Sequence, residues 1–286
     1  SLSQAASVDP FIDIFQTESF IDGSQSQKQT LYLQSSPEFH MKRLLVSHRH
    51  DIFQICKAFR SGENSSKHNW EFSILEWYRI NWTLSSLMDE VFAIFKLCFK
   101  NISYYNTITY KDCFEKYLSI NPFAVTVADL QSCALENGLT NLNYAEKDDW
   151  LNYLLGSLIE PQLGLKTPTF LTEYPSSQAA LAKTQTDVWG NSIALRFELY
   201  YQGIELCNGF SELANPKEQR ERFLSDQTIR KKLSKSELKM DENFLEALEL
   251  GLPNCCGVAV GLDRLIMLAL DIPHINQALS FGYENT

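Results

Sequence analysis

Two arginines far apart in the chain lie among residue types that suit the binding of a nucleotide. Arg60 occurs in the segment 59–63 (FRSGE) and Arg264 in the segment 261–264 (GLDR). Between Arg60 and residue 78 the chain also supplies a titratable ring, two acids and an aromatic face, namely His68, Glu71, Phe72 and Glu76. Cationic side chains bind phosphate oxygens and an aromatic ring can stack on a base. This mixture indicates chemistry with ATP.

A second candidate site lies in the segment 193–207, where apolar residues alternate with polar ones. The alternation predicts a β-hairpin with its turn at Tyr201-Gln202, which places Glu198 directly opposite Glu205. Opposed like charges destabilise a sheet, and a divalent cation bound to both carboxylates would remove the repulsion. Magnesium prefers such oxygen ligands together with substrate phosphates. A shifted register with both acids in solvent is the alternative on spacing alone.

Three further acids lie near these segments. Glu212 follows the hairpin directly, Glu38 stands at a predicted helix start, and Glu76 shares one face of a predicted strand with Phe72 and Tyr78. Alone, Glu38 and Glu212 are typical of a helix cap and a turn. A buried Glu76 carboxylate needs a partner, and a ligand cation is one. Acids that converge on one pocket suit a substrate with two ammonium groups and a metal-bound triphosphate.

The elements that must position these residues follow from the hydrophobic periodicity. The sequence predicts a helix over 36–47 with Ser36 as N-cap, strands over 52–60 and 72–80 around a polar loop, and a mainly helical segment without chemistry over about 84–165. It then predicts strands over 169–174, 193–201 and 203–207, helices over 216–233 and 242–250, and a strand over 257–262 that leads into a helix over 263–270. Residues 21–30 are expected to form an exposed loop. Hairpins dominate, so an α+β fold with a mostly antiparallel sheet is expected.

Composition limits the classes of protein. The 286 residues, 44% of them hydrophobic, can bury a full core, and the formal net charge of -10 disfavours a general nucleic-acid binder. The basic residues between positions 217 and 235 are interrupted by acids and are typical of a solvated helix face. The seven cysteines form no C-x-x-C pair, which favours free thiols in a reducing cytoplasm. No apolar run has membrane-spanning length, and the first residues lack the pattern of a signal peptide.

Four stretches of the chain resemble catalytic domains of class II aminoacyl-tRNA synthetases, specifically the lysyl branch. These stretches are residues 36–45, 59–79, 203–213 and 257–265, in the order of the family's motifs, and the resemblance is weakest over 100–167. It implies one class II catalytic domain over 1–286. The chain has no room for the anticodon-binding barrel of a lysyl-tRNA synthetase, and it begins just after the expected place of the family's first motif, a dimer-interface helix.

The resemblance also implies a role for individual residues, with ATP and Mg²⁺ as cofactors. Arg60 and Arg264 would be the catalytic residues. The ATP-binding set would be Arg60, Ser61, Gly62, Glu63, His68, Asn69, Phe72, Glu205, Leu206, Gly261 and Arg264. The amino acid would contact Ser36, Pro37, Glu38, Glu76, Tyr78, Asn208, Glu212 and Ala259, and the metal would be held by Glu198 and Glu205. Catalysis would proceed by positioning and charge neutralisation, without a covalent protein intermediate.

The acceptor of the activated amino acid is a separate question. The chain resembles a stand-alone paralogue of lysyl-tRNA synthetase in two respects. It has no room for the barrel, and it has Ala259 where the synthetases usually have glycine and the paralogue alanine. That resemblance implies (R)-β-lysine as the amino acid, a lysine side chain of elongation factor P as the acceptor, and a cytoplasmic homodimer that does not use tRNA. The alternatives are an enzyme that charges tRNA with α-lysine and a non-catalytic amino-acid-binding or regulatory module; asparagine synthetase is a more distant reading.

Two positions depart from the family pattern. The family typically has glutamate two residues after the motif arginine, but here that position is Gly62 and the acid is Glu63. This shift bears on the contact with the adenine edge. Trp70 follows Asn69 where proline is usual, which changes the stiffness of the loop more than its chemistry.

Overall fold

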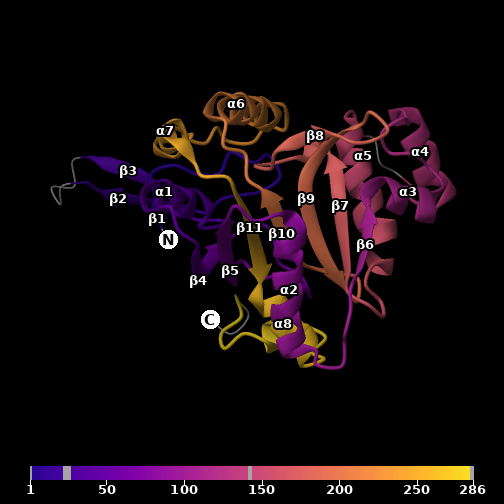
Figure 1. The fold of residues 1–286 in the computed structure, drawn as a ribbon. Coiled ribbons are helices and arrows are strands. Elements are labelled where there is room, and N and C mark those ends of the chain that lie inside the picture. The colour runs from indigo at the N-terminus through magenta and orange to yellow at the C-terminus, as the bar shows by residue number, and fades with distance from the viewer. Residues whose placement is uncertain (1, 22–26, 141–143, 284–286) are drawn as a thin grey trace. The chain divides into compact units, whose positions relative to one another are not determined.

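A computed structural model describes residues 2–21, 27–140 and 144–283 of the chain (Figure 1). The described residues form two compact units, the first made of Ser1–Trp82 with Glu212–Thr286 and the second of Thr83–Ser211. Within each unit, the pairs of described strands are antiparallel, except for one parallel pair in the second unit. The expectation of a mostly antiparallel α+β fold is confirmed.

The first unit contributes three neighbouring antiparallel strands, in the pairing order β4-β5-β11, to a larger sheet. The strands are β4 (Ile52–Phe59), β5 (Glu71–Ile80) and β11 (Cys255–Gly261), and their helices are α1 (Glu38–His48), α6 (Pro216–Lys232), α7 (Glu242–Gly251) and α8 (Leu262–Ala269), followed by the 3-10 turn Ile275–Gln277. Each of these strands and α-helices agrees with the sequence prediction to within three residues at its ends, whereas the 3-10 turn was not predicted. The periodicity is clear here because one side of each element is buried.

The start of α1 differs in detail from the prediction. The N-cap position is Pro37, not Ser36, and the N-cap residue makes no side-chain capping hydrogen bond. The Ser36 hydroxyl instead accepts a hydrogen bond from the backbone N–H of Glu38 at 3.1 Å. It also donates to Glu76 Oε2 at 2.7 Å, so Ser36 joins the helix start to β5. A hydroxyl can do both because it is a donor and an acceptor at once.

A small antiparallel sheet near the N-terminus was not predicted. It consists of β1 (Leu2–Ser3), β2 (Gln16–Phe20) and β3 (Lys28–Leu33) in the order β1-β3-β2. The prediction of a loop over 21–30 is wrong from Lys28 onward, and residues 22–26 of that segment lie outside the described part of the chain. All five residues of β2 are exposed, so its sequence carries no apolar alternation by which a strand could be recognised.

The basic helix α6 is only partly the solvated face that its charge pattern predicts. Arg220 forms an exposed ion pair with Glu242, with 2.6 Å between the closest atoms. Arg230, in contrast, is only 3% exposed and donates hydrogen bonds to the backbone carbonyls of Asp9 and Ile12 at 2.9 and 3.2 Å. Arg230 therefore ties α6 to the N-terminal segment and is not available to bind a polyanion.

The second unit combines a sheet with a helical segment. Its strands are β6 (Asn106–Thr109), β7 (Thr169–Pro175), β8 (Thr184–Thr186), β9 (Ser192–Tyr201) and β10 (Ile204–Ser211), where β6 and β7 are the parallel pair and β9 pairs with β7, β8 and β10. Its helices are α2 (Leu84–Cys98), α3 (Tyr110–Leu118), α4 (Val127–Glu136) and α5 (Lys147–Leu154), followed by a π-helix (Leu155–Ile159), the 3-10 turn Glu160–Gln162 and, after β7, the 3-10 turn Ser176–Gln178. The mainly helical prediction is confirmed, whereas the short strands β6 and β8 were missed.

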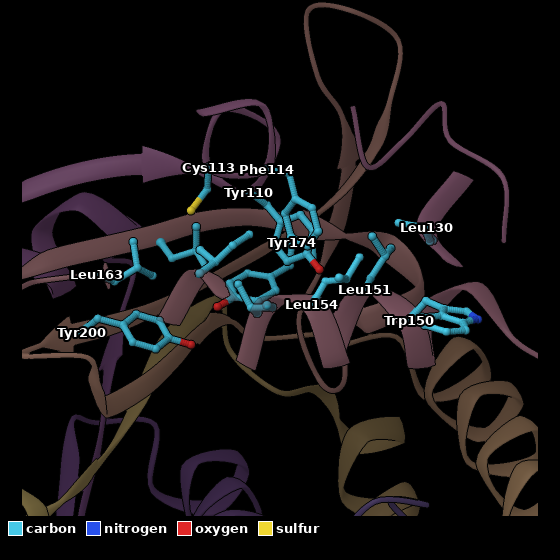
Figure 2. Packing of buried hydrophobic residues seen from close by; sticks show 14 of the residues in the cluster. Tyr110, Cys113, Phe114, Leu130, Trp150, Leu151, Leu154, Leu163, Tyr174 and Tyr200 are labelled. Carbon is cyan, nitrogen blue, oxygen red and sulfur yellow. The ribbon is translucent and has the colours of Figure 1, made fainter. Parts of the chain in front are cut away.

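A buried aromatic and aliphatic cluster holds these helices against the sheet (Figure 2). The ring of Tyr110 in α3 stacks on Phe114 with 4.6 Å between centroids and lies 5.1 Å from the ring of Tyr174 in β7. Trp150 and Leu154 of α5 belong to the same cluster and are almost fully buried. This segment contributes a core and positions β7 and β9.

The hairpin of β9 and β10 has a different register from the predicted one. Its tight turn lies at Gln202 and Gly203, which have φ values of 52° and 70°, one residue later than predicted. Two-residue turns of this kind need positive φ at both positions, and glycine supplies it at low cost. This turn places Glu205 opposite Tyr200, and a β-bulge between Glu205 and Cys207 then shifts the pairing so that Glu198 lies opposite Asn208. The predicted direct pairing of Glu198 with Glu205 is therefore wrong.

Among the helices of the described ranges, none is both long enough and apolar enough to cross a membrane. All seven cysteines are free thiols, as predicted from their spacing.

Candidate functional site

Three carboxylates of the first unit gather around one buried ammonium group. The Nζ atom of Lys42 lies 2.6 Å from Glu38 Oε1 and 2.5 Å from Glu212 Oε2. The side chain of Lys42 is 1% exposed, and so is that of Glu212. Glu76 completes the cluster, since its charge and those of Glu38 and Lys42 act on one another. The structure thus brings together Glu38, Glu76 and Glu212, which the sequence analysis proposed for amino-acid recognition.

Strand β5 supplies the polar wall of this cluster. Because side chains alternate along a strand, Glu76 and Tyr78 lie on the same face. The Tyr78 hydroxyl donates to Glu76 Oε1 at 2.6 Å, while the Ser36 hydroxyl donates to the other oxygen. Both oxygens of the buried carboxylate therefore have a donor, as a buried acid requires. Pro37, the neighbour of Ser36, is buried at the start of α1.

Strand β11 lies next to β5 and places two small residues across from these polar groups. Ala259 is the direct partner of Glu76, and Gly257 is the direct partner of Tyr78. A Cβ atom at position 257 would lie 2.3 Å from Tyr78 Cε1 and 2.4 Å from Glu212 Oε1. Gly257 is thus required for space, and the methyl group of Ala259 is on the same face of the sheet as the side chain of Glu76. Sequence analysis identified Ala259 but not Gly257.

Burial dominates the protonation of these acids. Burial, reinforced by the charge of Glu38, raises the pKa of Glu76 to about 7, although the hydrogen bonds from Tyr78 and Ser36 and the charge of Lys42 oppose the increase. Burial likewise raises the pKa of Glu212 to about 8, opposed by Lys42. The two carboxyls therefore titrate near neutral pH, and a bound cation would favour their ionised forms.

The protonation of Lys42 is secured by its partners. Burial alone would lower the pKa of the ammonium, but the charges and hydrogen bonds of Glu212 and Glu38 hold it above its ordinary value. Sequence analysis did not identify Lys42 as a functional residue. A signal was present, because a glutamate followed four residues later by a lysine forms a favourable pair on a helix. The partnership with Glu212 had no local signal.

The loop between β4 and β5 contains most of the residues proposed for ATP. The guanidinium carbon of Arg60 lies 5.2 Å from the ring centroid of Phe72, and its Nη1 lies 3.8 Å from Glu63 Oε1. The Nε atom of Arg60 is buried, and no hydrogen-bond partner for it occurs in the described residues. A buried donor without an acceptor is costly, and a phosphate oxygen would satisfy it. This loop therefore fits an anionic nucleotide.

His68 and Arg264 contact each other directly. The Nη2 atom of Arg264 lies 2.5 Å from His68 Nε2, and Ser65 Oγ lies 2.8 Å from His68 Nδ1. Since arginine can only donate, Nε2 is the acceptor and the Nδ1–H donates to Ser65. Burial, together with the charges of Arg264, Arg60 and Lys67, lowers the pKa of His68 to about 4. The imidazole is therefore neutral at physiological pH.

Backbone contacts from distant segments hold this loop in place. The N–H of Ser61 donates to the carbonyl of Asp13 at 2.8 Å, and the carbonyl of Ser66 accepts from Ile275 at 2.8 Å. Asn69 is 6% exposed and its Nδ2 donates to the carbonyl of Glu71 at 2.7 Å. Gly62 has φ of 80°, which explains a glycine where the family has an acid.

Trp70, the second departure from the family pattern, is packed between aromatic rings. Its ring lies 6.1 Å from Phe15 and 4.1 Å from Tyr283, measured between centroids.

The end of β11 lies beside the start of β5, since Gly261 is opposite Ile74, and Gly261 is also the N-cap of α8. In the first turn of α8, Asp263 accepts a hydrogen bond from the N–H of Ser73 at 2.6 Å, which fixes the helix that carries Arg264.

The second unit holds the acids proposed for metal binding. Glu198 is 7% exposed, and its Oε2 accepts hydrogen bonds from the hydroxyls of Tyr174 at 2.5 Å and Tyr200 at 2.6 Å. Its other oxygen is paired with Arg196, whose Nε donates to Asn208 Oδ1 at 3.1 Å. The protein itself therefore neutralises Glu198.

Glu205 lies opposite Tyr200. Because Tyr200 is two residues after Glu198 on β9, the two acids are diagonal neighbours on one face of the hairpin. Both of their charges act on Arg196 and, despite its burial, hold the pKa of that guanidinium above its ordinary value. Leu206, the next residue, is buried. In the parts of the chain that the structure describes, no three His, Cys, Asp or Glu residues are grouped to bind a metal. A metal here would need phosphate oxygens among its ligands.

Comparisons with known proteins place the chain in a family. The model of the class II tRNA synthetases for D, K and N matches residues 15–285, and the chain belongs to this family of ATP-using enzymes. Among similar proteins, the elongation factor P–(R)-β-lysine ligase of Vibrio cholerae is 42% identical over 285 residues, which cover 99% of this chain and 87% of that protein. The ligases of the same name from Haemophilus ducreyi and Buchnera aphidicola are 38% and 39% identical, covering 99% and 100% of this chain and 86% and 88% of theirs.

Proposed function

We propose that this protein is an ATP-dependent ligase that activates (R)-β-lysine as an adenylate and transfers it to a lysine side chain of elongation factor P. The proposal draws the substrate and the acceptor from relatives about 40% identical over nearly the whole chain. The observation that carries it is the cluster of Glu38, Glu76 and Glu212 around Lys42. Three ionised carboxylates against one ammonium leave two negative charges, which match the two ammonium groups of the amino acid.

The residues of the pocket would divide the recognition of the substrate. Glu38 would take the amino group nearer the carboxylate, and Glu212 with Tyr78 would take the distal ammonium. Glu76 would support Tyr78 through the hydrogen bond of 2.6 Å. Buried carboxylates are strong partners for cations because little water competes with them. A substrate without the distal ammonium would leave Glu212 with only Lys42 as its counter-ion.

The loop residues would act on ATP by positioning and charge neutralisation. Arg60, with its buried Nε free for an acceptor, would bind the α-phosphate while a carboxylate oxygen of the amino acid attacks the phosphorus and pyrophosphate leaves. His68 and Arg264 would hold the outer phosphates. Because His68 is neutral, it would contribute a hydrogen bond, and Arg264 would contribute the charge.

Magnesium would be bound on the face of β9 and β10 that carries both acids. Glu205 would be the principal carboxylate ligand, with Glu198 as the second one, held in place by Arg196, Tyr174 and Tyr200. When bound, the ion would neutralise phosphate charge. Asn208 lies directly across from Glu198 and would support the same face.

We also propose that the enzyme acts in the cytoplasm as a homodimer. The free thiols suit a reducing compartment. Sedimentation velocity of the purified protein tests the assembly state, and a monomer at micromolar concentration would contradict the dimer.

The proposed activity is tested by magnesium-dependent exchange of pyrophosphate into ATP. We expect strong exchange with (R)-β-lysine and weak exchange with L-α-lysine, followed by acyl transfer to elongation factor P. Exchange with α-lysine and transfer to tRNA would instead indicate a lysyl-tRNA synthetase activity. No exchange with either amino acid would indicate a non-catalytic module and overturn the proposal.

A further inference from the structure

The acids proposed to recognise the amino acid, Glu38, Glu76 and Glu212, are called the recognition acids below. Among the described residues, Lys42 is the one basic side chain that is buried and forms ion pairs with two of them, Glu38 and Glu212. Lys42 lies on α1, one helical turn after Glu38. Its ammonium lies 6.0 Å from the ring centroid of Phe244 in α7, and that ring stacks on Phe39 of α1 at 4.6 Å. The packing of α1 on α7 thus adds a contact with an aromatic ring to the two carboxylates that hold the ammonium.

This geometry divides the oxygens of the two acids. Lys42 occupies Oε1 of Glu38 and Oε2 of Glu212, so each acid has one further oxygen for another cation. Glu212 Oε1 is directed towards Gly257 and the ring of Tyr78. A carboxylate held through one oxygen by a fixed ammonium cannot rotate freely, and its second oxygen then has a defined direction.

We propose that Lys42 is a positioning residue for amino-acid recognition, whose internal ammonium sets the distance and orientation of Glu38 and Glu212 so that their remaining oxygens select two separated ammonium groups. This inference rests on the proposed function of the pocket and names the residue that gives the pocket its geometry. Lys42 itself does not touch the reacting atoms. Its effect is exerted through the two acids.

The charge balance of the pocket supports the same role. The titratable groups that face Lys42 or its partners are Glu38, Glu212, Glu76 and Tyr78. Without the ammonium, three carboxylates would share one buried space, and like charges at that distance favour protonation of at least one of them. A protonated carboxyl attracts a substrate ammonium only weakly. Lys42 therefore favours the ionised form of Glu212, since its charge and hydrogen bond oppose the burial that raises the pKa of that acid.

The substitution Lys42→Met tests the inference, since methionine has a similar length and no charge. We expect the KM for (R)-β-lysine in pyrophosphate exchange to rise about 30-fold or more at pH 7.5, the order expected for removal of one partner of a buried charge pair. The KM for ATP and the kcat at saturating amino acid should change by less than about threefold, because the loop residues are untouched. The KM for the amino acid should fall again towards pH 9 as the acids ionise.

Two further variants separate positioning from folding. Lys42→Arg keeps the charge in the protein but replaces a point charge by a planar fork, and we expect the KM for the amino acid to rise at least about fivefold with the melting temperature retained. Arg43→Met changes the neighbouring position of the same helix and should leave both KM values unchanged. The positioning role would be overturned by an unchanged amino-acid KM in Lys42→Arg. It would also be overturned if Lys42→Met lowered kcat and raised the KM values of ATP and the amino acid to the same extent.

The failure of this inference is distinguishable from that of the proposed function. An unsubstituted protein that exchanges pyrophosphate with (R)-β-lysine, together with a Lys42→Met variant of normal amino-acid KM, would overturn the role of Lys42 alone. An unsubstituted protein without any exchange would overturn both.

Discussion

Gly257 lies directly opposite Tyr78 in the antiparallel pair of β11 and β5, and the backbone of Gly257 approaches the tyrosine ring so closely that a Cβ atom would lie 2.3 Å from Cε1. The same Cβ atom would lie 2.4 Å from Glu212 Oε1. Neither distance is compatible with van der Waals contact. The absence of a side chain at position 257 is therefore what allows both Tyr78 and Glu212 to lie against this position of β11.

We expect Gly257→Ala to displace Tyr78, Glu212 or both. The kcat/KM for (R)-β-lysine should fall about 100-fold, since a misplacement of the order of 1 Å in a recognition site has effects of that size. Gly156→Ala is the matched control, because its nearest neighbour to an added Cβ is 4.0 Å away. Steady-state exchange kinetics of both variants check the prediction. Normal amino-acid kinetics in Gly257→Ala would show that the pocket tolerates the methyl group.

The substitution Glu212→Gln should remove selectivity for a distal ammonium. Glutamine keeps the shape of the side chain but not its charge, so (R)-β-lysine should lose about 30-fold or more in kcat/KM, as for a truncated buried charge pair. An analogue with the same carbon chain and no distal amine should lose little. Exchange assays with both amino acids give the ratio, and Glu221→Gln, at an exposed position, is the control. Unchanged selectivity would exclude Glu212 from the pocket.

The pH dependence of amino-acid use should follow the raised pKa values of Glu76, about 7, and Glu212, about 8. Both groups are neutral when protonated, so kcat/KM for the amino acid should rise between pH 6 and 8.5, because ionised acids bind ammonium groups. The KM for ATP should stay level over this range, since the pKa of His68 is about 4 and the ring remains neutral. A level amino-acid profile would contradict the assignment.

The same pKa values predict the pH dependence of stability. Each folded-state pKa lies above the ordinary value of 4.5, so the folded chain binds more protons than the unfolded chain between pH 4.5 and about 8. The contribution of these acids to the free energy of unfolding is therefore complete below pH 4.5 and is lost as the pH rises through 7 to 8. Thermal melts of the protein and of Glu76→Gln at pH 6 and 8.5 check this, and an equal pH response of the two would contradict it.

The ion pair of Arg196 and Glu198 should matter far more for stability than its exposed counterpart. In Arg196→Met the buried Glu198 would lose its cation, and the free energy of unfolding should fall by about 3–5 kcal/mol. Arg220→Met removes the exposed pair with Glu242, which should cost at most about 1 kcal/mol. Urea denaturation of the two variants gives both values. Equal losses would show that Glu198 is solvated or otherwise neutralised.

Glu205→Gln should raise the magnesium requirement of the exchange reaction. The carboxylate is the principal ligand in the proposed site, and glutamine offers only a neutral carbonyl oxygen. We expect the magnesium concentration for half-maximal exchange to rise about tenfold, with activity restored by excess metal. Titration of exchange with magnesium at fixed ATP provides the measurement. Glu237→Gln serves as the control, and an unchanged magnesium curve would remove Glu205 from the metal site.

Much of the local structure follows from the sequence alone. The strands β4, β5 and β11 and the helices α1 and α7 were predicted within three residues, because one face of each is apolar and the period of that face identifies the element. The same alternation placed Glu76 and Tyr78 on one side of β5, as their hydrogen bond confirms. The order of the four motif stretches predicted the family, and the family match over residues 15–285 confirms it.

The tertiary structure decided which residues meet. The register of the β9–β10 hairpin depends on backbone φ at Gln202 and Gly203 and on a bulge, neither of which a hydrophobic pattern specifies. The β2 strand has no buried face and so no signal. Lys42 and Glu212 are far apart in the chain, and only the folded protein brings that ammonium between two acids and excludes water from them. Sequence thus determined which chemical groups are present and on which faces they lie, whereas long-range packing determined their partners, protonation and direction.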